Sequence, residues 1–181
     1  MFDVAYAAAP EQVALIPGAA AAVRRLNDAR VPVVVITNQS GIARGIVTEA
    51  QYAAVRTRLD MLLEAAGARI DASYHCPHHP EFGAECQCRK PGPQLYDDAA
   101  RAHGLDRARS LYAGDRWRDV APGLDAGGFG VLVPSPNTPP DDLARASREA
   151  LVVETLDEAV GAWERWLGTA RQAAPSGTAA R

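Results

Sequence analysis

Residues 31–41 read VPVVVITNQSG, an apolar, β-branched run that ends in a polar turn. The apolar side chains follow one another without the alternation of a half-buried strand, which is typical of a parallel strand covered on both faces. We therefore predict a strand over Val31–Thr37. The stretch before it opens with Pro17-Gly18 and is rich in alanine, which favours a helix over Ala19–Ala29.

Downstream of this strand, helical and strand patterns alternate. Thr48 and Gln51 form a capping-box pair before a helix that Gly67 ends, and Thr155 and Glu158 form a second such pair. Further strands are expected at 72–76, 110–113, 130–133 and 151–153, and further helices at 94–103, 119–126 and 141–149. This alternation predicts an α/β fold, a doubly wound (Rossmann-like) parallel sheet with helices on both faces, which binds ligands beyond the carboxyl ends of its strands. We expect one domain over residues 1–168, followed by a disordered tail over 169–181.

The overall charge excludes several classes of partner. The 181 residues carry 19 Lys and Arg against 22 Asp and Glu, a formal charge of −3, so no global basic field is present to hold nucleic acid. The longest apolar run, near Val31 to Ile36, is too short to span a bilayer, and Asp3 stands where a secretory signal would carry Lys or Arg. We expect a soluble, cytoplasmic monomer that captures a small anion with a local cluster.

The cysteines and histidines are crowded into one segment. Cys76, Cys86 and Cys88 are the three cysteines of the chain, and an odd number so close together does not resemble a disulfide framework. Three neighbouring histidines accompany them: His75, His78 and His79. Three thiolates and one imidazole make the closed Cys3His set of a structural zinc site, which would hold the loop over 76–93 folded. His78 is the preferred fourth ligand, with the other two left open on spacing; buried thiols beside surface histidines are the alternative.

Two segments offer groups for an anion. Thr37–Gly41, TNQSG, follows the apolar strand with a hydroxyl, amides and backbone N–H groups, and Arg44 adds a cation. Arg89-Lys90 follows the last cysteine, so zinc that fixes Cys88 would also fix two cations beside it. An ordinary turn and a pair of solvated charges are the alternatives.

A third segment offers groups for a cation. Gly114-Asp115-Arg116 follows another predicted strand, with Asp119 in the next turn. Mg²⁺ is commonly held by one or two carboxylates together with the phosphate of a substrate. Asp115 is the natural ligand, Asp119 is a direct or indirect helper, and Arg116 is a contact for phosphate or sugar. A turn with a helix cap is the alternative.

The motifs TNQSGIARG, CPHHP, CxCRKP and GDRWRD resemble those of the haloacid dehalogenase superfamily. The likeness is strongest to its branch of heptose-bisphosphate and histidinol-phosphate phosphatases, and it covers Asp3 to about Val133. In that family a strand-end aspartate attacks phosphorus to form an aspartyl-phosphate, a second aspartate two residues later acts as acid and base, and Mg²⁺ bridges nucleophile and phosphate. The resemblance therefore implies a Mg²⁺-dependent phosphomonoester hydrolase with a zinc loop.

The resemblance also implies a role for each matching residue. Thr37 would hydrogen-bond the phosphoryl group, Lys90 would stabilise it during transfer, and Asp115 would bind Mg²⁺. Zinc would be held by Cys76, His78, Cys86 and Cys88. The substrate would be contacted by Asp3, Tyr6, Asn38, Gln39, Ser40, Arg44, Arg89 and Arg116, the last standing where this branch often has a lysine.

The chain departs from the family in its opening motif. The family's apolar strand followed by DxDGT does not occur in residues 1–181, and Asp3 cannot replace it because Ala5 stands two residues later. In this superfamily that strand lies in the middle of the sheet, so without it both neighbouring strands keep unpaired backbone groups. We favour a mis-set start or a truncated copy of a phosphatase over a protein that evolved without its centre, and we expect residues 1–181 to be inactive.

Three functions remain in view. The first is hydrolysis of a small phosphorylated metabolite, a sugar bisphosphate such as D-glycero-D-manno-heptose 1,7-bisphosphate, with histidinol phosphate as the alternative substrate. The second is a zinc-stabilised pseudo-phosphatase that binds a sugar phosphate without turnover. The third is a structural zinc-loop protein in which the other motifs are coincidental.

Overall fold

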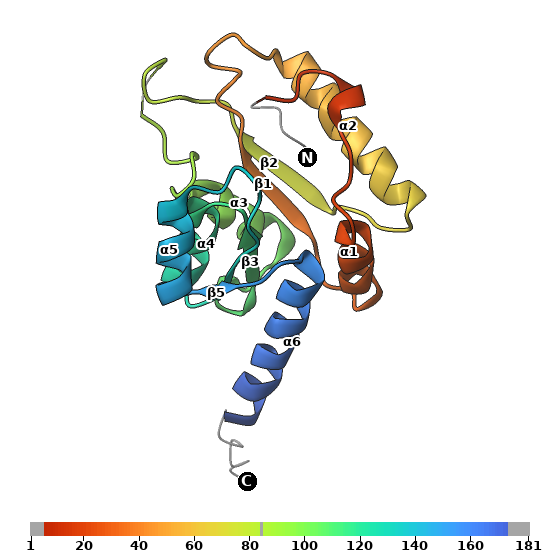
Figure 1. Cartoon of the computed structure of the whole chain (residues 1–181), viewed down its shortest axis with the longest axis vertical. Coiled ribbons are helices and arrows are strands. Elements are labelled where there is room, and N and C mark those ends of the chain that lie inside the picture. The colour runs from red at the N-terminus through yellow and green to blue at the C-terminus, as the bar shows by residue number, and fades with distance from the viewer. Residues whose placement is uncertain (1–5, 84, 174–181) are drawn as a thin grey trace.

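The computed structural model describes residues 6–83 and 85–173 of the chain, and its helices and strands alternate as the sequence pattern predicts (Figure 1). In chain order the elements are η1 (Pro10–Gln12), α1 (Ala19–Asp28), β1 (Val34–Asn38), α2 (Glu49–Ala65), β2 (Ala72–Cys76), α3 (Gln94–His103), η2 (Arg107–Arg109), β3 (Leu111–Gly114), α4 (Trp117–Asp125), β4 (Phe129–Leu132), α5 (Pro140–Glu149), β5 (Leu151–Val152) and α6 (Leu156–Ala173).

The strands form two separate parallel sheets. β1 pairs with β2, with Val34 opposite Ala72, and the second sheet has the order β3-β4-β5. In Figure 1, β1 and β2 lie side by side, with α1 and α2 towards one side of the molecule and α3, α4 and α5 towards the other. Within the described residues, no strand joins β1 to β3. The architecture is a Rossmann-like α/β fold whose sheet is interrupted in the middle.

The two sheets nevertheless run in the same direction. At their carboxyl ends, Lys90 contacts both the Ile36 carbonyl of β1 and Asp119, which follows β3. At their amino ends, α6 makes the link: Leu156 packs in the same apolar cluster as Val33, and the Trp163 indole donates to the Arg109 carbonyl at 3.0 Å. The carboxyl ends of β1 and β3 therefore meet at one edge of the molecule.

The boundaries of the elements follow from local chemistry. β1 begins at Val34, three residues later than predicted, because the Val31 N–H is bonded to the end of α1 at Leu26 and Pro32 has no N–H to pair. The capping box before α2 is formed, with the Gln51 N–H donating to the Thr48 hydroxyl at 3.1 Å.

The last helix differs from the prediction. α6 buries Val160 and Trp163 and continues to Ala173, so residues 169–173 are helical where we expected a disordered tail. Ala, Arg and Gln dominate this stretch and all favour helix, which outweighs its low apolar content. Residues 174–181 and Asp3 lie outside the described residues. No helix within the described residues is both long and apolar enough to cross a membrane.

Candidate functional site

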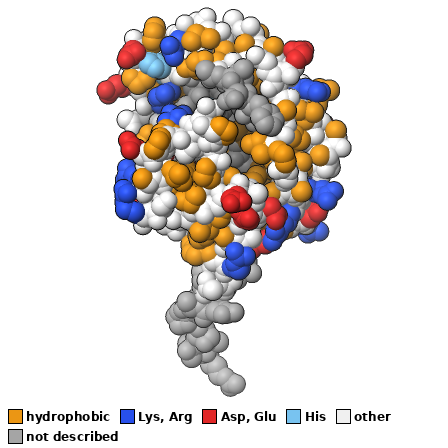
Figure 2. Space-filling model, in the orientation of Figure 1, with side chains coloured by type: hydrophobic (Ala, Val, Ile, Leu, Met, Phe, Trp, Pro, Cys, Tyr) orange, Lys and Arg blue, Asp and Glu red, His pale blue; other side chains and the backbone are white. Residues whose placement is uncertain are grey.

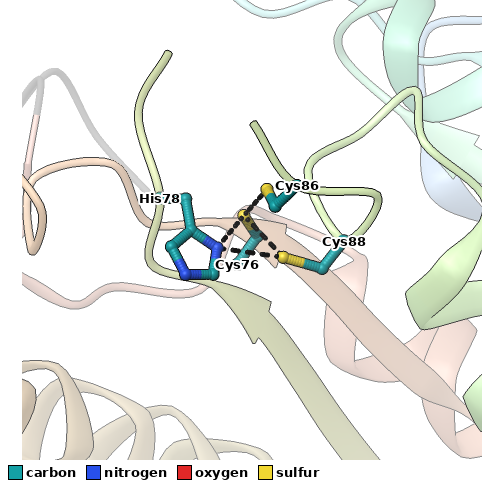
Figure 3. Close-up of side chains that lie close together, drawn as sticks. All are labelled: Cys76, His78, Cys86 and Cys88. Carbon is teal, nitrogen blue, oxygen red and sulfur yellow. Dashed lines mark hydrogen bonds between the residues drawn. The ribbon is translucent and has the colours of Figure 1, made fainter. Parts of the chain in front are cut away.

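The three thiols and one imidazole meet at the carboxyl end of β2. Cys76 ends that strand, and the following loop brings His78, Cys86 and Cys88 back to it, so that the four donor atoms all lie within 4.8 Å of one another (Figure 3). The sulfur of Cys76 lies 3.6 Å from that of Cys86 and 3.1 Å from that of Cys88, too far for a disulfide. Zn–S bonds of about 2.3 Å at tetrahedral angles place sulfurs about 3.8 Å apart, so this donor set fits zinc.

The thiols differ in how readily they ionise. Burial raises the pKa of Cys76, and burial together with hydrogen bonds that the Cys88 thiol donates to Cys76 and Cys86 raises the pKa of Cys88 to about 12. Burial also raises the pKa of Cys86, but hydrogen bonds with Cys88 and Cys76 outweigh it and lower that pKa to about 7. Cys86 therefore ionises more readily than Cys76 and Cys88, and a bound dication would favour the thiolate form of all three.

The two histidines left open by spacing lie elsewhere. The His75 ring lies tilted against the Tyr52 ring, with 4.4 Å between the ring centroids, and its Nε2 lies 3.2 Å from the Glu49 carboxylate. His79 accepts a hydrogen bond from the Glu81 N–H. The geometry therefore selects the histidine of the thiol cluster, as the spacing favoured.

The loop after β1 is tied to this cluster. The Gln39 N–H donates to the Cys76 carbonyl at 2.7 Å. The Asn38 side-chain amide donates to the Lys90 carbonyl at 3.1 Å and accepts from the Lys90 N–H at 2.9 Å. Asn38 was predicted to line the substrate pocket, but both ends of its amide hold the backbone of Lys90. Gln39 donates its side-chain amide to the Thr37 hydroxyl at 3.0 Å.

Lys90 is the link between the two halves of the site. It is the single lysine of the sequence. Its ammonium lies 2.7 Å from the Asp119 carboxylate and 2.5 Å from the Ile36 carbonyl, and its side chain is 10% exposed. The neighbouring Arg89 donates to the His78 carbonyl at 3.1 Å, so the thiol loop fixes this cation as well.

A second group of side chains borders the same loop. The Tyr6 ring covers Gly41, where an added Cβ would lie 2.6 Å from the ring, so the close approach requires glycine. The Tyr6 hydroxyl lies 3.3 Å from the Ser40 hydroxyl and accepts from Arg44 at 3.0 Å. The Arg44 guanidinium also lies 5.9 Å from the centre of the Phe82 ring.

The carboxylate after β3 is clamped by the loop after β4. Ser135 donates its hydroxyl to Oδ2 of Asp115 at 2.8 Å, and Thr138 donates to the Asp115 carbonyl at 2.7 Å. A hard, oriented carboxylate at a strand end suits Mg²⁺, which prefers oxygen ligands. Arg116 is held in turn by Asp142, whose carboxylate accepts from its Nε at 2.9 Å.

The first turn of α4 packs tightly on β3. A Cβ at Gly114 would lie 2.4 Å from the Cβ of Asp119, so only glycine lets this carboxylate lie across the strand end. The second oxygen of Asp119 accepts from the Arg116 N–H at 3.2 Å. Burial and the nearby Arg116 guanidinium lower the pKa of Arg118, whose buried Nε has no hydrogen-bond partner among the described residues. Arg118 is therefore a partly buried cation beside Arg116.

The structure thus brings the Arg89-Lys90 pair and the GDR segment to one edge of the sheet. Ser135, Thr138 and Asp142 were not predicted from the sequence. A signal for the first two was present, because the polar stretch PSPNT follows a predicted strand as TNQSG does.

Comparison with known proteins agrees with this arrangement. A family model described as HAD-hydrolase-like matches residues 87–159, which include Lys90, Asp115 and Asp119. The D-glycero-beta-D-manno-heptose-1,7-bisphosphate 7-phosphatase of Bordetella bronchiseptica is 38% identical over 133 residues, covering 74% of this chain and 73% of that protein. The chain belongs to the haloacid dehalogenase (HAD) family of phosphatases. The enzyme of the same name from Rhodopseudomonas palustris is 40% identical to this HAD phosphatase over 127 residues, 67% of this chain and 71% of the relative.

A solved structure carries the likeness through most of the fold. The D,D-heptose 1,7-bisphosphate phosphatase of B. bronchiseptica, complexed with magnesium and phosphate, superposes on this HAD phosphatase with a TM-score of 0.78 at 33% identity. The superposition covers 93% of this chain and 92% of that one. The fold and family implied by the sequence motifs are therefore confirmed.

Proposed function

We propose that this chain recognises a sugar bisphosphate, the D-glycero-beta-D-manno-heptose 1,7-bisphosphate for which both relatives are named, with Mg²⁺ at Asp115. The observation that supports this most directly is the meeting of Lys90, Asp115 and Asp119 at one sheet edge. Bound Mg²⁺ supplies charge neutralisation and orientation of the phosphoryl group. Zinc at the Cys3His cluster holds the loop that carries Arg89 and Lys90. The free thiols suit the reducing cytoplasm, where we place a monomeric protein.

Different side chains have different proposed roles, according to their position at the site. Lys90 neutralises the phosphoryl oxygens, with Thr37 as a hydrogen-bond donor at the end of β1. The part of the substrate away from the transferred phosphate is recognised by Arg89 and Arg116. The group around Tyr6, Ser40 and Arg44 contacts the same part.

We further propose that residues 1–181 bind this substrate without turning it over. Ser135 already holds the Asp115 carboxylate, and Lys90 holds that of Asp119, so neither is placed as a free nucleophile. The chain is in this respect a pseudo-phosphatase, and hydrolysis requires a further carboxylate at the same edge.

Calorimetric titration with the heptose bisphosphate, alongside a phosphate-release assay, tests both parts. Residues 1–181 should bind it saturably in the presence of Mg²⁺ and release no phosphate. Arg89→Ala should weaken binding about tenfold, whereas Arg101→Ala, an exposed cation on α3, should not. Folded protein that binds no sugar bisphosphate would refute the proposed substrate; turnover abolished by Asp115→Asn would refute the absence of hydrolysis. Tighter binding of histidinol phosphate would replace the heptose by the alternative.

A further inference from the structure

Arg89, Arg116 and Arg118 lie near one another at the sheet edge that carries Asp115. Burial lowers the pKa of Arg118, and the charges of Arg116 and Arg89 act in the same direction, which places the guanidinium groups within electrostatic range of one another. In Figure 2, charged side chains lie around the rim of the face and apolar ones across its centre, so the cations of this face are found at its rim. Because like charges repel, a cation in such a group needs an anionic partner to hold one orientation.

Asp142 is the carboxylate that holds Arg116. One of its oxygens, Oδ2, accepts from Nε of Arg116 at 2.9 Å and from the Trp117 N–H at 3.0 Å. These donors belong to the N-cap residue and the first residue of α4, so a single oxygen fixes both the start of that helix and the guanidinium beside it. Among the described residues, no other carboxylate forms an ion pair with Arg116.

The side of α5 that carries Asp142 is packed against the start of α4. Ala146 lies in the apolar cluster that the Trp117 ring covers, and the Arg145 guanidinium lies 4.4 Å from the centre of that ring. Asp142 is three positions from Arg145 and four from Ala146, so these residues share one side of the helix. The carboxylate is therefore held by a packed helix rather than by a loop.

Asp142 carries its negative charge at neutral pH. Burial opposes this charge, but hydrogen bonds from the Arg116 guanidinium and the Trp117 N–H outweigh burial and hold the pKa of Asp142 below its ordinary value of 3.8. Asp142 also lies in the first turn of α5, where the helix dipole favours a carboxylate. Its charge is thus already matched by these donors, which limits its repulsion of an anion bound to Arg116.

The pairing with Asp142 leaves the outer part of the Arg116 guanidinium for a ligand. Asp142 accepts from Nε, and the two Nη groups make no hydrogen bond within the part of the chain that the structure describes. The Arg116 side chain is 32% exposed, so these groups are accessible. Parallel N–H groups of a planar guanidinium match two oxygens of a phosphate, a contact that the ammonium of a lysine cannot make. An orientation that is set before binding lowers the entropic cost of this contact.

We propose that Asp142 is a positioning residue, which fixes the Arg116 guanidinium so that its Nη groups make a bidentate contact with a phosphate of the substrate. The role rests on the proposed function, because it assigns to Arg116 the phosphate of the sugar bisphosphate that is not transferred. Asp142 itself does not touch the ligand. The segment from Ser135 to Asp142 then positions two neighbouring side chains at once, because Ser135 holds Asp115 and Asp142 holds Arg116.

A double-mutant cycle of Arg116→Lys and Asp142→Asn tests this role, with the heptose bisphosphate titrated calorimetrically in the presence of Mg²⁺. Each single variant should bind about tenfold more weakly than the unaltered chain. In the Asp142→Asn background, Arg116→Lys should cost less than about twofold, because a guanidinium that is not held acts only as a charge. Asp142→Asn keeps an oxygen that accepts from the Trp117 N–H, so the start of α4 stays capped. A purely structural role of Asp142 would make the two losses additive and would overturn the proposal.

Asp141→Asn is the matched control, since it removes an exposed carboxylate from the preceding position of α5. It should leave the affinity unchanged. A loss equal to that of Asp142→Asn would assign the effect to the overall charge of α5 and overturn the proposal. Tighter binding by Asp142→Asn would show that the carboxylate competes with the ligand for Arg116, which also overturns it. If Asp142→Asn does not fold, Asp142→Ser, which keeps an oxygen acceptor in the first turn, replaces it in the cycle.

A second probe separates the role of Asp142 from the proposed substrate. Inorganic phosphate is titrated into the nitrogen-labelled chain, and the Nε–H signal of Arg116 is identified by its loss in Arg116→Lys. This signal should shift saturably, with a midpoint about tenfold higher in Asp142→Asn. If no variant binds the heptose bisphosphate but the signal behaves in this way, the proposed substrate is wrong and the role of Asp142 stands. If the heptose bisphosphate does not bind and the signal either ignores phosphate or keeps its midpoint in Asp142→Asn, the role of Asp142 is overturned as well.

Discussion

The ammonium of Lys90 lies 2.7 Å from the carboxylate of Asp119, and the two side chains are only 10% and 11% exposed. Lys90 belongs to the loop that the thiol cluster holds, whereas Asp119 belongs to the first turn of α4. The pair therefore joins the two sheets near their carboxyl ends. It also holds the cation that we propose to bind phosphate beside a carboxylate.

Removal of either partner should be costly, because it leaves the other charge buried and unpaired. Lys90→Ala and Asp119→Ala should each lower the free energy of unfolding by about 3–5 kcal/mol. The double variant should lose less than the sum of the two, since the second change removes the orphaned charge. Urea unfolding of the complete cycle measures the coupling. Arg101→Ala, from a surface pair with Asp98, should cost less than about 0.5 kcal/mol; strictly additive losses at Lys90 and Asp119 would contradict this account.

Metal analysis can show which of the three histidines near the cysteines binds zinc. The unaltered chain, purified without chelator, should carry about one zinc ion, and Cys88→Ser and His78→Ala should lose it. His79→Ala is the matched control and should keep its zinc, because its side chain bonds the Glu81 N–H outside the cluster. Chelation should lower the thermal midpoint of the unaltered chain and leave that of Cys88→Ser unchanged. A metal-free chain, or loss of zinc in His79→Ala alone, would contradict the assignment.

Periodicity and capping predicted most of the fold because they act over a few residues. The limits of β2 and α3 were predicted to the residue, and Gly104 in the left-handed region marks the end of α3 locally. The interruption between β1 and β3 was predicted only from the family resemblance, because a missing neighbouring strand leaves no trace in the residues of either strand. The contact of Asn38 with the Lys90 backbone was not predicted, because the two residues lie 52 positions apart. Hydrogen bonds of that span depend on tertiary packing rather than on spacing.

The stability of the first sheet should depend on pH through Asp71. Its carboxylate accepts from the Val33 N–H at 2.8 Å, and this bond, with help from Arg69 and against burial, holds the pKa of Asp71 below its ordinary value of 3.8. Because the folded-state pKa is the lower one, this contribution to stability is complete above the ordinary value and is lost as pH falls through the folded-state value.

Urea unfolding between neutral pH and about pH 3 should therefore show a steeper loss of stability in the unaltered chain than in Asp71→Asn. Asp98→Asn, which removes a surface carboxylate on α3 and leaves the Val33 bond intact, should keep the steeper dependence. Parallel curves for the unaltered chain and Asp71→Asn would show that the Val33 bond does not set this dependence.

Ser135 should raise the affinity for Mg²⁺ by orienting the carboxylate of Asp115. Its hydroxyl donates to Oδ2 of Asp115 at 2.8 Å and so fixes the plane of the carboxylate at the end of β3. Groups that orient a ligand in this way are typically worth about 10–100-fold in metal affinity. Ser135→Ala should therefore weaken Mg²⁺ binding about tenfold, measured by calorimetry in the presence of inorganic phosphate, while the free energy of unfolding falls by only about 1 kcal/mol.

Two further variants distinguish orientation of Asp115 from a general loss of a hydroxyl. Ser135→Thr keeps the donor and should restore most of the Mg²⁺ affinity. Ser147→Ala removes a hydroxyl that donates to the Leu143 carbonyl within α5, at 2.8 Å, and should leave the affinity unchanged. Equal losses of Mg²⁺ affinity in Ser135→Ala and Ser135→Thr would mean that packing of the loop after β4, rather than the hydrogen bond to Asp115, sets this affinity.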